Sequence, residues 1–128
     1  EFLIRTLRRR AVVFMISDFL ADPLDKPLGK LARKHETLAL EVTDPLDEKL
    51  PKAGRVVLSD PETGWEVSVN TNNPNLRMGY EKLMRRQHEG FERVCRKHGI
   101  DTARLSTDRD RLRDLHRMLK RRARKRVR

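Results

Sequence analysis

The sequence has few of the residues that most often build disulfide scaffolds, membrane spans and base-stacking surfaces. Of its 128 residues one is a cysteine, Cys95, and 5% are aromatic. A single cysteine excludes an internal disulfide framework, and scattered aromatics do not form a platform for stacked bases. No apolar run approaches the roughly 20 residues that a membrane span needs, and Glu1 to Arg5 lack the pattern of a secretory signal. We therefore expect one domain at most, located in the cytoplasm.

The motifs of common enzyme sites are also incomplete. The sequence contains no glycine-rich phosphate loop. Cys95 and His98 have a ligand-like spacing, but a zinc site needs at least three protein ligands. His35-Glu36 and His88-Glu89 do not extend to the metalloprotease pattern, which requires a second histidine on the same helix face. We expect that the chain is not an enzyme and that it binds no cofactor on its own.

The net charge of +11 is concentrated at one end of the chain. Residues 109–128 hold eleven Lys/Arg against Asp110 and Asp114, whereas residues 1–108 hold nineteen Lys/Arg against seventeen Asp/Glu. The body is therefore close to neutral, and the positive charge belongs to the C-terminal segment.

Apolar runs and helical periodicity predict an α/β fold. Residues 11–16 form an unbroken apolar run, which is typical of a parallel strand covered on both faces. Residues 37–42 and 103–105 predict two more strands. Helical spacing predicts a short helix from Leu28 to about His35, a long helix from Asn73 to Gly99, and a last helix whose apolar pattern ends at Leu119, with a frayed end beyond it.

Two further strands, over residues 55–59 and 65–69, flank a proline- and glycine-containing turn and predict a β-hairpin. Trp65, Val67 and Val69 alternate with polar residues, so we expect one face of this hairpin to be buried, with Trp65 packed against the sheet or a helix.

Together these elements predict a partial open Rossmann-like sheet of three parallel strands, with a β-hairpin insertion and flanking helices. A strand with two apolar faces normally lies inside a sheet, so we expect that a neighbour of residues 11–16 on the N-terminal side is missing. Because an uncovered apolar edge offers unpaired backbone groups, we expect a homodimer formed through residues 11–16.

Acidic and hydroxyl side chains follow each of the three parallel strands: Ser17-Asp18, Thr43-Asp44, and Ser106-Thr107-Asp108. Open α/β sheets bind ligands outside the carboxyl ends of their strands, and Mg²⁺ prefers such oxygen ligands. Asp and Ser in these places also cap the helices that follow strands. Both interpretations fit the spacing.

Four motifs in order resemble the bacterial domain-of-unknown-function family 58. They are residues 9–19 (Arg-Arg-Ala-Val-Val-Phe-Met-Ile-Ser-Asp-Phe), Asp44-Pro45 with Leu50-Pro51 and Gly54, residues 60–64 (Asp-Pro-Glu-Thr-Gly), and residues 105–108 (Leu-Ser-Thr-Asp) before a basic end. The resemblance implies a von Willebrand factor A-like fold, with residues 1–119 as its C-terminal half and residues 120–128 as a basic tail. It also implies a MoxR-type AAA ATPase as partner.

The resemblance further implies a place for metal. In the A-domain pattern a DxSxS loop, a later threonine and an aspartate after the fourth strand hold a divalent ion, and Asp18 matches that aspartate. The loop and the threonine are absent from this chain, so the site is incomplete, and Mg²⁺ is expected only in a longer protein. Ser17, Asp44, Thr107 and Asp108 are the implied partner-binding residues.

The function that we expect is a non-enzymatic adaptor that assists the ATPase. Two alternatives are open: nucleic-acid binding through the basic C-terminal helix, which nothing in the sequence equips to read bases, and a phosphatase or nuclease that uses the strand-end acids.

Overall fold

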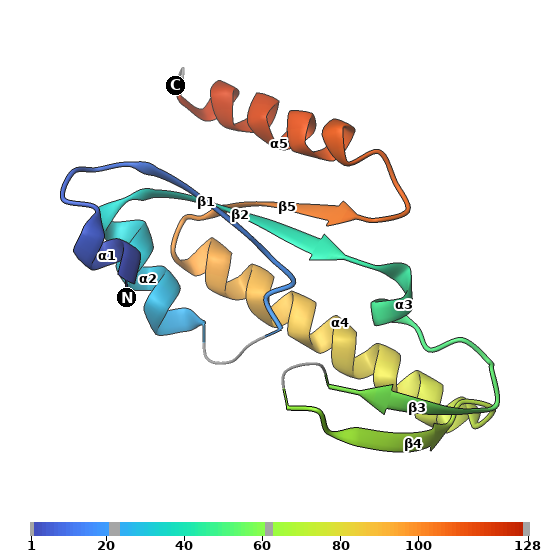
Figure 1. The fold of residues 1–128 in the computed structure, drawn as a ribbon. Helices are drawn as coiled ribbons and strands as arrows, with labels where there is room; N and C mark the ends of the chain where they lie inside the picture. Colours follow the sequence, from blue (N-terminus) through green and yellow to red (C-terminus); the bar gives the residue numbers. More distant parts are fainter. Residues whose placement is uncertain (1, 21–23, 61–62, 127–128) are drawn as a thin grey trace.

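The computed structural model describes residues 2–20, 24–60 and 63–126, and its centre is a three-stranded parallel sheet (Figure 1). The strands are β1 (Val12–Ser17), β2 (Glu36–Thr43) and β5 (Asp101–Ser106), hydrogen-bonded in the order β1-β2-β5. Leu38 of β2 lies opposite Phe14 of β1 and opposite Asp101 of β5. The three parallel strands expected from the sequence are therefore confirmed.

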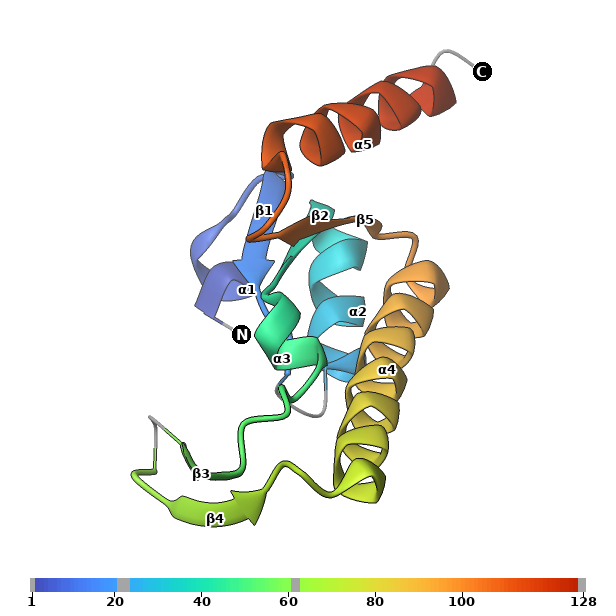
Figure 2. The ribbon, with the colours of Figure 1, turned by 90° about the vertical axis from the view of Figure 1, so that its right-hand side faces the viewer.

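Helices cover both faces of this sheet (Figure 2). α2 (Asp25–Lys34) and α4 (Pro74–Lys97) lie on one face, and α5 (Arg111–Arg126) lies on the other. Two short helices, α1 (Phe2–Thr6) and α3 (Pro45–Glu48), complete the set in the described residues and were not expected from the sequence.

The core consists of two layers that meet at β2. Ala39 packs with Leu28 of α2 and with Phe91 and Cys95 of α4 on one face. On the other face Leu38 and Leu40 pack against Met118 of α5. β2 is thus the strand that is buried on both faces, which is why its residues 37–41 are all buried.

The expectation that residues 11–16 are covered on both faces is wrong for this chain. Val12, Phe14 and Ile16 are 53%, 50% and 66% exposed, whereas Val13 is buried and Met15 is packed against the α2–α4 layer. β1 is an edge strand, and α5 lies over β2 and β5, so the side chains that β1 presents to that face stay open to solvent.

The hairpin is confirmed as β3 (Arg55–Ser59) and β4 (Glu66–Asn70), which pair antiparallel in a sheet of their own. The expected burial of its inner face is wrong, because Trp65 is 74% exposed and Val67 is 43% exposed. The hairpin extends away from the main sheet (Figures 1 and 2), so its side chains do not reach the core. Its base is fixed by the buried Thr71, whose hydroxyl donates to the Gly54 carbonyl at 2.8 Å.

The long helix begins and ends where the sequence predicts. Asn73 caps α4 by accepting a hydrogen bond from the Asn75 amide at 2.9 Å, and Gly99 ends the helical run with a φ of +67°. α5, in contrast, continues to Arg126 instead of fraying after Leu119. Its Arg122 lies between Glu36 and Asp101, at the N-terminal ends of β2 and β5, and forms ion pairs with both. Residues 127–128 of the expected tail lie outside the described residues.

Candidate functional site

The acidic side chains expected at the strand ends fall into two separate groups. Asp44 belongs to the group that joins the end of β2 to the loop after β5. One carboxylate oxygen of Asp44 accepts the Leu46 amide at 2.9 Å and thereby caps α3, while the other accepts the Thr107 hydroxyl at 2.6 Å. The hydrogen bond from Thr107, supported by the one from Leu46, lowers the pKa of Asp44 below its usual value. Asp44 therefore does act as a cap, and it also ties the end of β2 to the loop after β5.

Asp108 lies in the same loop as Thr107. Its carboxylate accepts a hydrogen bond from the Ser106 hydroxyl and lies 3.8 Å from the Arg109 guanidinium. Asp108 is exposed, so both interactions leave its outer side accessible to a binding partner.

Ser17 and Asp18 form a separate exposed turn at the end of β1. The Ser17 hydroxyl donates to Asp18 at 3.2 Å, and Asp18 also accepts the Leu20 amide at 3.4 Å. Phe19 within this turn has a φ of +53°, which is unusual for a bulky residue, and its ring stacks on Phe91 at 4.2 Å. The stacking holds the turn in this conformation.

The described residues do not fit a magnesium site. No group of three or more His, Cys, Asp or Glu side chains in the described ranges is arranged to hold a metal ion. Asp18 contributes one carboxylate, and its hydrogen bonds remain within its own turn. One carboxylate is too few for a cation that takes about six oxygen ligands, even when water supplies several of them.

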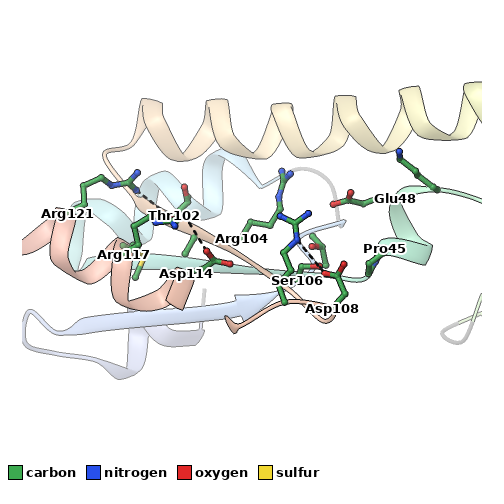
Figure 3. A pocket seen from close by; sticks show the side chains of 14 residues that line it. Pro45, Glu48, Thr102, Arg104, Ser106, Asp108, Asp114, Arg117 and Arg121 are labelled. Carbon is green, nitrogen blue, oxygen red and sulfur yellow. Dashed lines mark hydrogen bonds and ion pairs between the residues drawn. The ribbon is translucent and has the colours of Figure 1, made fainter. Parts of the chain in front are cut away.

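A cavity of about 650 Å³ lies beside the Asp44–Thr107 link, along the outer side of β5 (Figure 3). α3 and the residue after it form one end of the cavity, and the middle of α5, from Asp114 to Arg121, forms the other. Its cationic side chains are Lys49, Arg104, Arg109, Arg117 and Arg121. Glu48, Asp108 and Asp114 are its acidic residues, so the lining carries a net positive charge.

A buried charge cluster lies behind Arg104, and no sequence motif indicated it. Glu41 of β2 is 3% exposed and accepts hydrogen bonds from His88 Nδ1 at 2.6 Å and from Arg104 Nε at 3.0 Å. Arg104 also approaches Glu92 at 3.8 Å. The detectable signal was Glu41 itself, a charged residue inside the apolar run of β2, because a buried carboxylate requires partners.

Residues 1–90 match the family described as "Protein of unknown function DUF58". The chain belongs to this family. The match covers more than half of the chain and includes β1, β2, the hairpin and most of α4, so the resemblance inferred from the motifs is confirmed for DUF58.

Bacterial relatives of this DUF58 chain come from mycobacteria. An uncharacterized protein of Mycobacterium avium is 41% identical over 126 residues, which cover 97% of this chain and 73% of that protein. An uncharacterized protein of Mycobacterium tuberculosis (strain ATCC 25618 / H37Rv) is 40% identical over 123 residues, which cover 93% of this chain but 38% of that protein. A Mycobacterium bovis protein matches to the same extent. No solved structure matches the DUF58 chain with significance.

Among the described residues no helix is both long and apolar enough to cross a membrane.

Proposed function

We propose that this DUF58 chain is a non-enzymatic protein-binding module. The observation that carries the proposal is the exposed apolar side of β1, where Val12, Phe14 and Ile16 follow one another on one face of an edge strand. Apolar side chains that gather on a surface mark interaction sites, and an edge strand adds unpaired backbone groups to them.

The polar chemistry of the strand ends supports binding rather than catalysis. The hydroxyls of Ser17, Ser106 and Thr107 each donate to a neighbouring carboxylate, which is the pattern of stabilised turns and caps. The Cys95 thiol is buried, and burial raises its pKa to about 12, so it is a poor nucleophile.

The finer proposal is that the module assists a MoxR-type AAA ATPase, as the resemblance to A-like domains implies. The strand-end surface with Ser17, Asp44, Thr107 and Asp108 would contact the ATPase. Magnesium in a longer protein stays a prediction, since the residues that the structure describes (2–20, 24–60 and 63–126) do not form such a site on their own.

This proposal is tested by affinity purification of the tagged chain with the MoxR-type ATPase of the same genome, in the presence of Mg²⁺ and ATP. We expect association, and we expect the charge reversals Asp18→Lys and Asp108→Lys each to weaken it. Glu66→Lys is the matched control, because Glu66 is exposed on the hairpin. Absence of association, or equal weakening by all three variants, would contradict the proposal.

The open edge of β1 also supports a homodimer through residues 11–16. Two β1 edges could pair about a twofold axis and cover Phe14 and Ile16 in both copies. Light scattering should give twice the chain mass of 15.1 kDa, and Phe14→Lys should return the chain to a monomer. A wild-type mass of one chain at micromolar concentration would refute the dimer.

Nucleic-acid binding is the second candidate, and the composition of α5 favours it. Between Arg111 and Arg126 this helix has nine Lys/Arg against Asp114. Such binding would depend on phosphate contacts and fall steeply with salt. A gel shift that persists at physiological salt and is lost when Lys120 and Arg124 are replaced by glutamate would support it, and a shift only at low salt would count against it.

A further inference from the structure

The outer edge of β5 is a second strand edge, on the side of the sheet opposite β1. β5 pairs with β2 and with no other described strand. The Thr107 amide, directly after β5, donates to the Thr43 carbonyl of β2 at 2.9 Å. Backbone groups point alternately to the two sides of a strand, so those of Thr102, Arg104 and Ser106 point away from β2. All three residues line the cavity of about 650 Å³.

Two contacts agree with this direction. The Thr102 carbonyl accepts a hydrogen bond from the Arg121 guanidinium at 3.3 Å, and the Ser106 carbonyl accepts the Arg109 amide at 3.4 Å. Both donors come from the outer side of β5. The amides of Thr102, Arg104 and Ser106 thus remain directed into the cavity, where an added strand could accept their hydrogen bonds.

The charges around this edge differ between its two sides. On the α5 side Arg117 and Arg121 line the cavity and are exposed. Among the described residues Arg117 has one acidic neighbour, Asp114, at 3.7 Å. On the α4 side Arg104 is already held by Glu41 and Glu92. The unbalanced positive charge is therefore on the α5 side (Figure 3).

We propose that the outer edge of β5 binds an extended acidic segment of a partner protein by strand addition. In such complexes main-chain hydrogen bonds supply affinity and alternate side chains supply specificity. The inference rests on the proposed protein-binding function and deepens it, because it states which chemistry the partner segment needs.

The spacing of the arginines specifies the segment further. α5 runs back over β5 (Figure 1), and Arg117 and Arg121 are one helical turn apart, about 6 Å along the helix axis. Every second side chain of a strand is separated by about 6.6 Å. Carboxylates at alternate positions of the added strand would therefore each meet one arginine. The intervening side chains would point to the α4 side, where Arg104 is already paired with Glu41 and Glu92, and we expect them to be uncharged.

The probe for this inference is a fluorescein-labelled ten-residue peptide that alternates glutamate with valine. We expect its fluorescence anisotropy to rise on binding to the chain. A peptide with lysine in place of glutamate should bind at least about tenfold more weakly, because attraction becomes repulsion. A peptide with proline at two neighbouring central positions, one valine and one glutamate, should also lose at least about tenfold, because neighbouring N–H groups point to opposite edges and one of the two must face β5.

The double variant Arg117→Glu with Arg121→Glu tests the location of the site. It should weaken binding of the glutamate peptide by at least about tenfold. Arg111→Glu with Lys120→Glu is the matched control, because it changes the net charge equally on the same helix at exposed positions outside the cavity lining. Circular dichroism checks that all variants are folded. The control should bind within about twofold of the wild type.

Three results would overturn the inference. They are equal binding of the proline peptide, equal weakening by the control variant, and full displacement of the peptide by a single-stranded oligonucleotide of the same charge. Failure of the ATPase to associate, with the peptide result as expected, would reject that partner and leave the β5 site in place. Association with the ATPase without peptide binding would reject the β5 site alone.

Discussion

Replacing His88 by leucine should destabilise this chain more than replacing its partner Glu41 by leucine. Both residues are buried, and the Glu41 carboxylate accepts hydrogen bonds from His88 at 2.6 Å and from Arg104 at 3.0 Å. His88→Leu leaves a buried carboxylate with Arg104 as its remaining partner. Glu41→Leu leaves the buried His88 ring without its hydrogen bond to Glu41, and its Nε2 has no partner among the described residues either, while Arg104, which is 40% exposed, can turn toward water.

The expected losses in unfolding free energy follow from the group that each substitution leaves buried without a partner. Removing one partner of a buried charge lowers the free energy of unfolding by about 3–5 kcal/mol, because the charge stays buried without that partner. Because Arg104 still pairs with Glu41, we expect the low end, about 3 kcal/mol, for His88→Leu. A buried polar group without a partner costs about 1–3 kcal/mol, and burial of the leucine side chain offsets part of this, so we expect about 1 kcal/mol for Glu41→Leu.

The assay is urea unfolding followed by circular dichroism at pH 7. With a slope of about 2 kcal/mol per molar urea, the midpoint should fall by about 1.5 M for His88→Leu and by about 0.5 M for Glu41→Leu. His116→Leu is the control, because His116 is exposed on α5 and its replacement should stay within about 0.5 kcal/mol. An equal effect of the two core substitutions, or a larger effect of Glu41→Leu, would refute the reasoning.

Four further predictions follow from single side chains. Because hydrogen bonds hold the pKa of Asp44 below 3.8, they stabilise the fold above that pH; Asp44→Asn should lower the urea midpoint at pH 7, and the difference should shrink as the pH falls below 3.8. With a pKa of about 12 and full burial, Cys95 should stay unlabelled by a thiol reagent at pH 8 until the chain is unfolded, when one thiol per chain should react. The exposed Trp65 should emit like free tryptophan, and Trp65→Ala should change the unfolding free energy by less than about 0.5 kcal/mol; a blue-shifted maximum would contradict this. Asp18→Ala should have an equally small effect, since Asp18 is exposed and bonds within its own turn, and a loss of several kcal/mol would show a structural role.

The fold was predictable where local pattern and burial agree. The apolar runs of β1 and β2 and the helical spacing of α4 located these elements within one or two residues. Burial on both faces was assigned to the wrong strand, because the apolar composition of residues 11–16 does not reveal whether a neighbouring element covers it. The predicted burial of Trp65 was wrong for a similar reason. Alternation predicts that a hairpin has two different faces, but it does not predict that the hairpin reaches the core.

The candidate site was predictable in part. Asp44 and Thr107 lie at the carboxyl ends of neighbouring parallel strands and form a hydrogen bond, as expected from that topology. Asp18, in contrast, forms its hydrogen bonds within its own turn. The Glu41–His88–Arg104 cluster depends on contacts between residues 47 and 63 positions apart, and single-sequence patterns do not encode such pairs. The cationic side of the β5 edge required knowing that α5 folds back over that strand.

The polar links at the two ends of β5 together fix its register against β2. At one end Thr107 bonds to Asp44, and at the other Arg122 joins Asp101 to Glu36. A slip by two residues, about 6.6 Å along the strand, would break both links at once. The register of β5 against β2 is thus fixed at both ends of the strand. Its outer edge therefore presents the same residues to an added strand in every molecule.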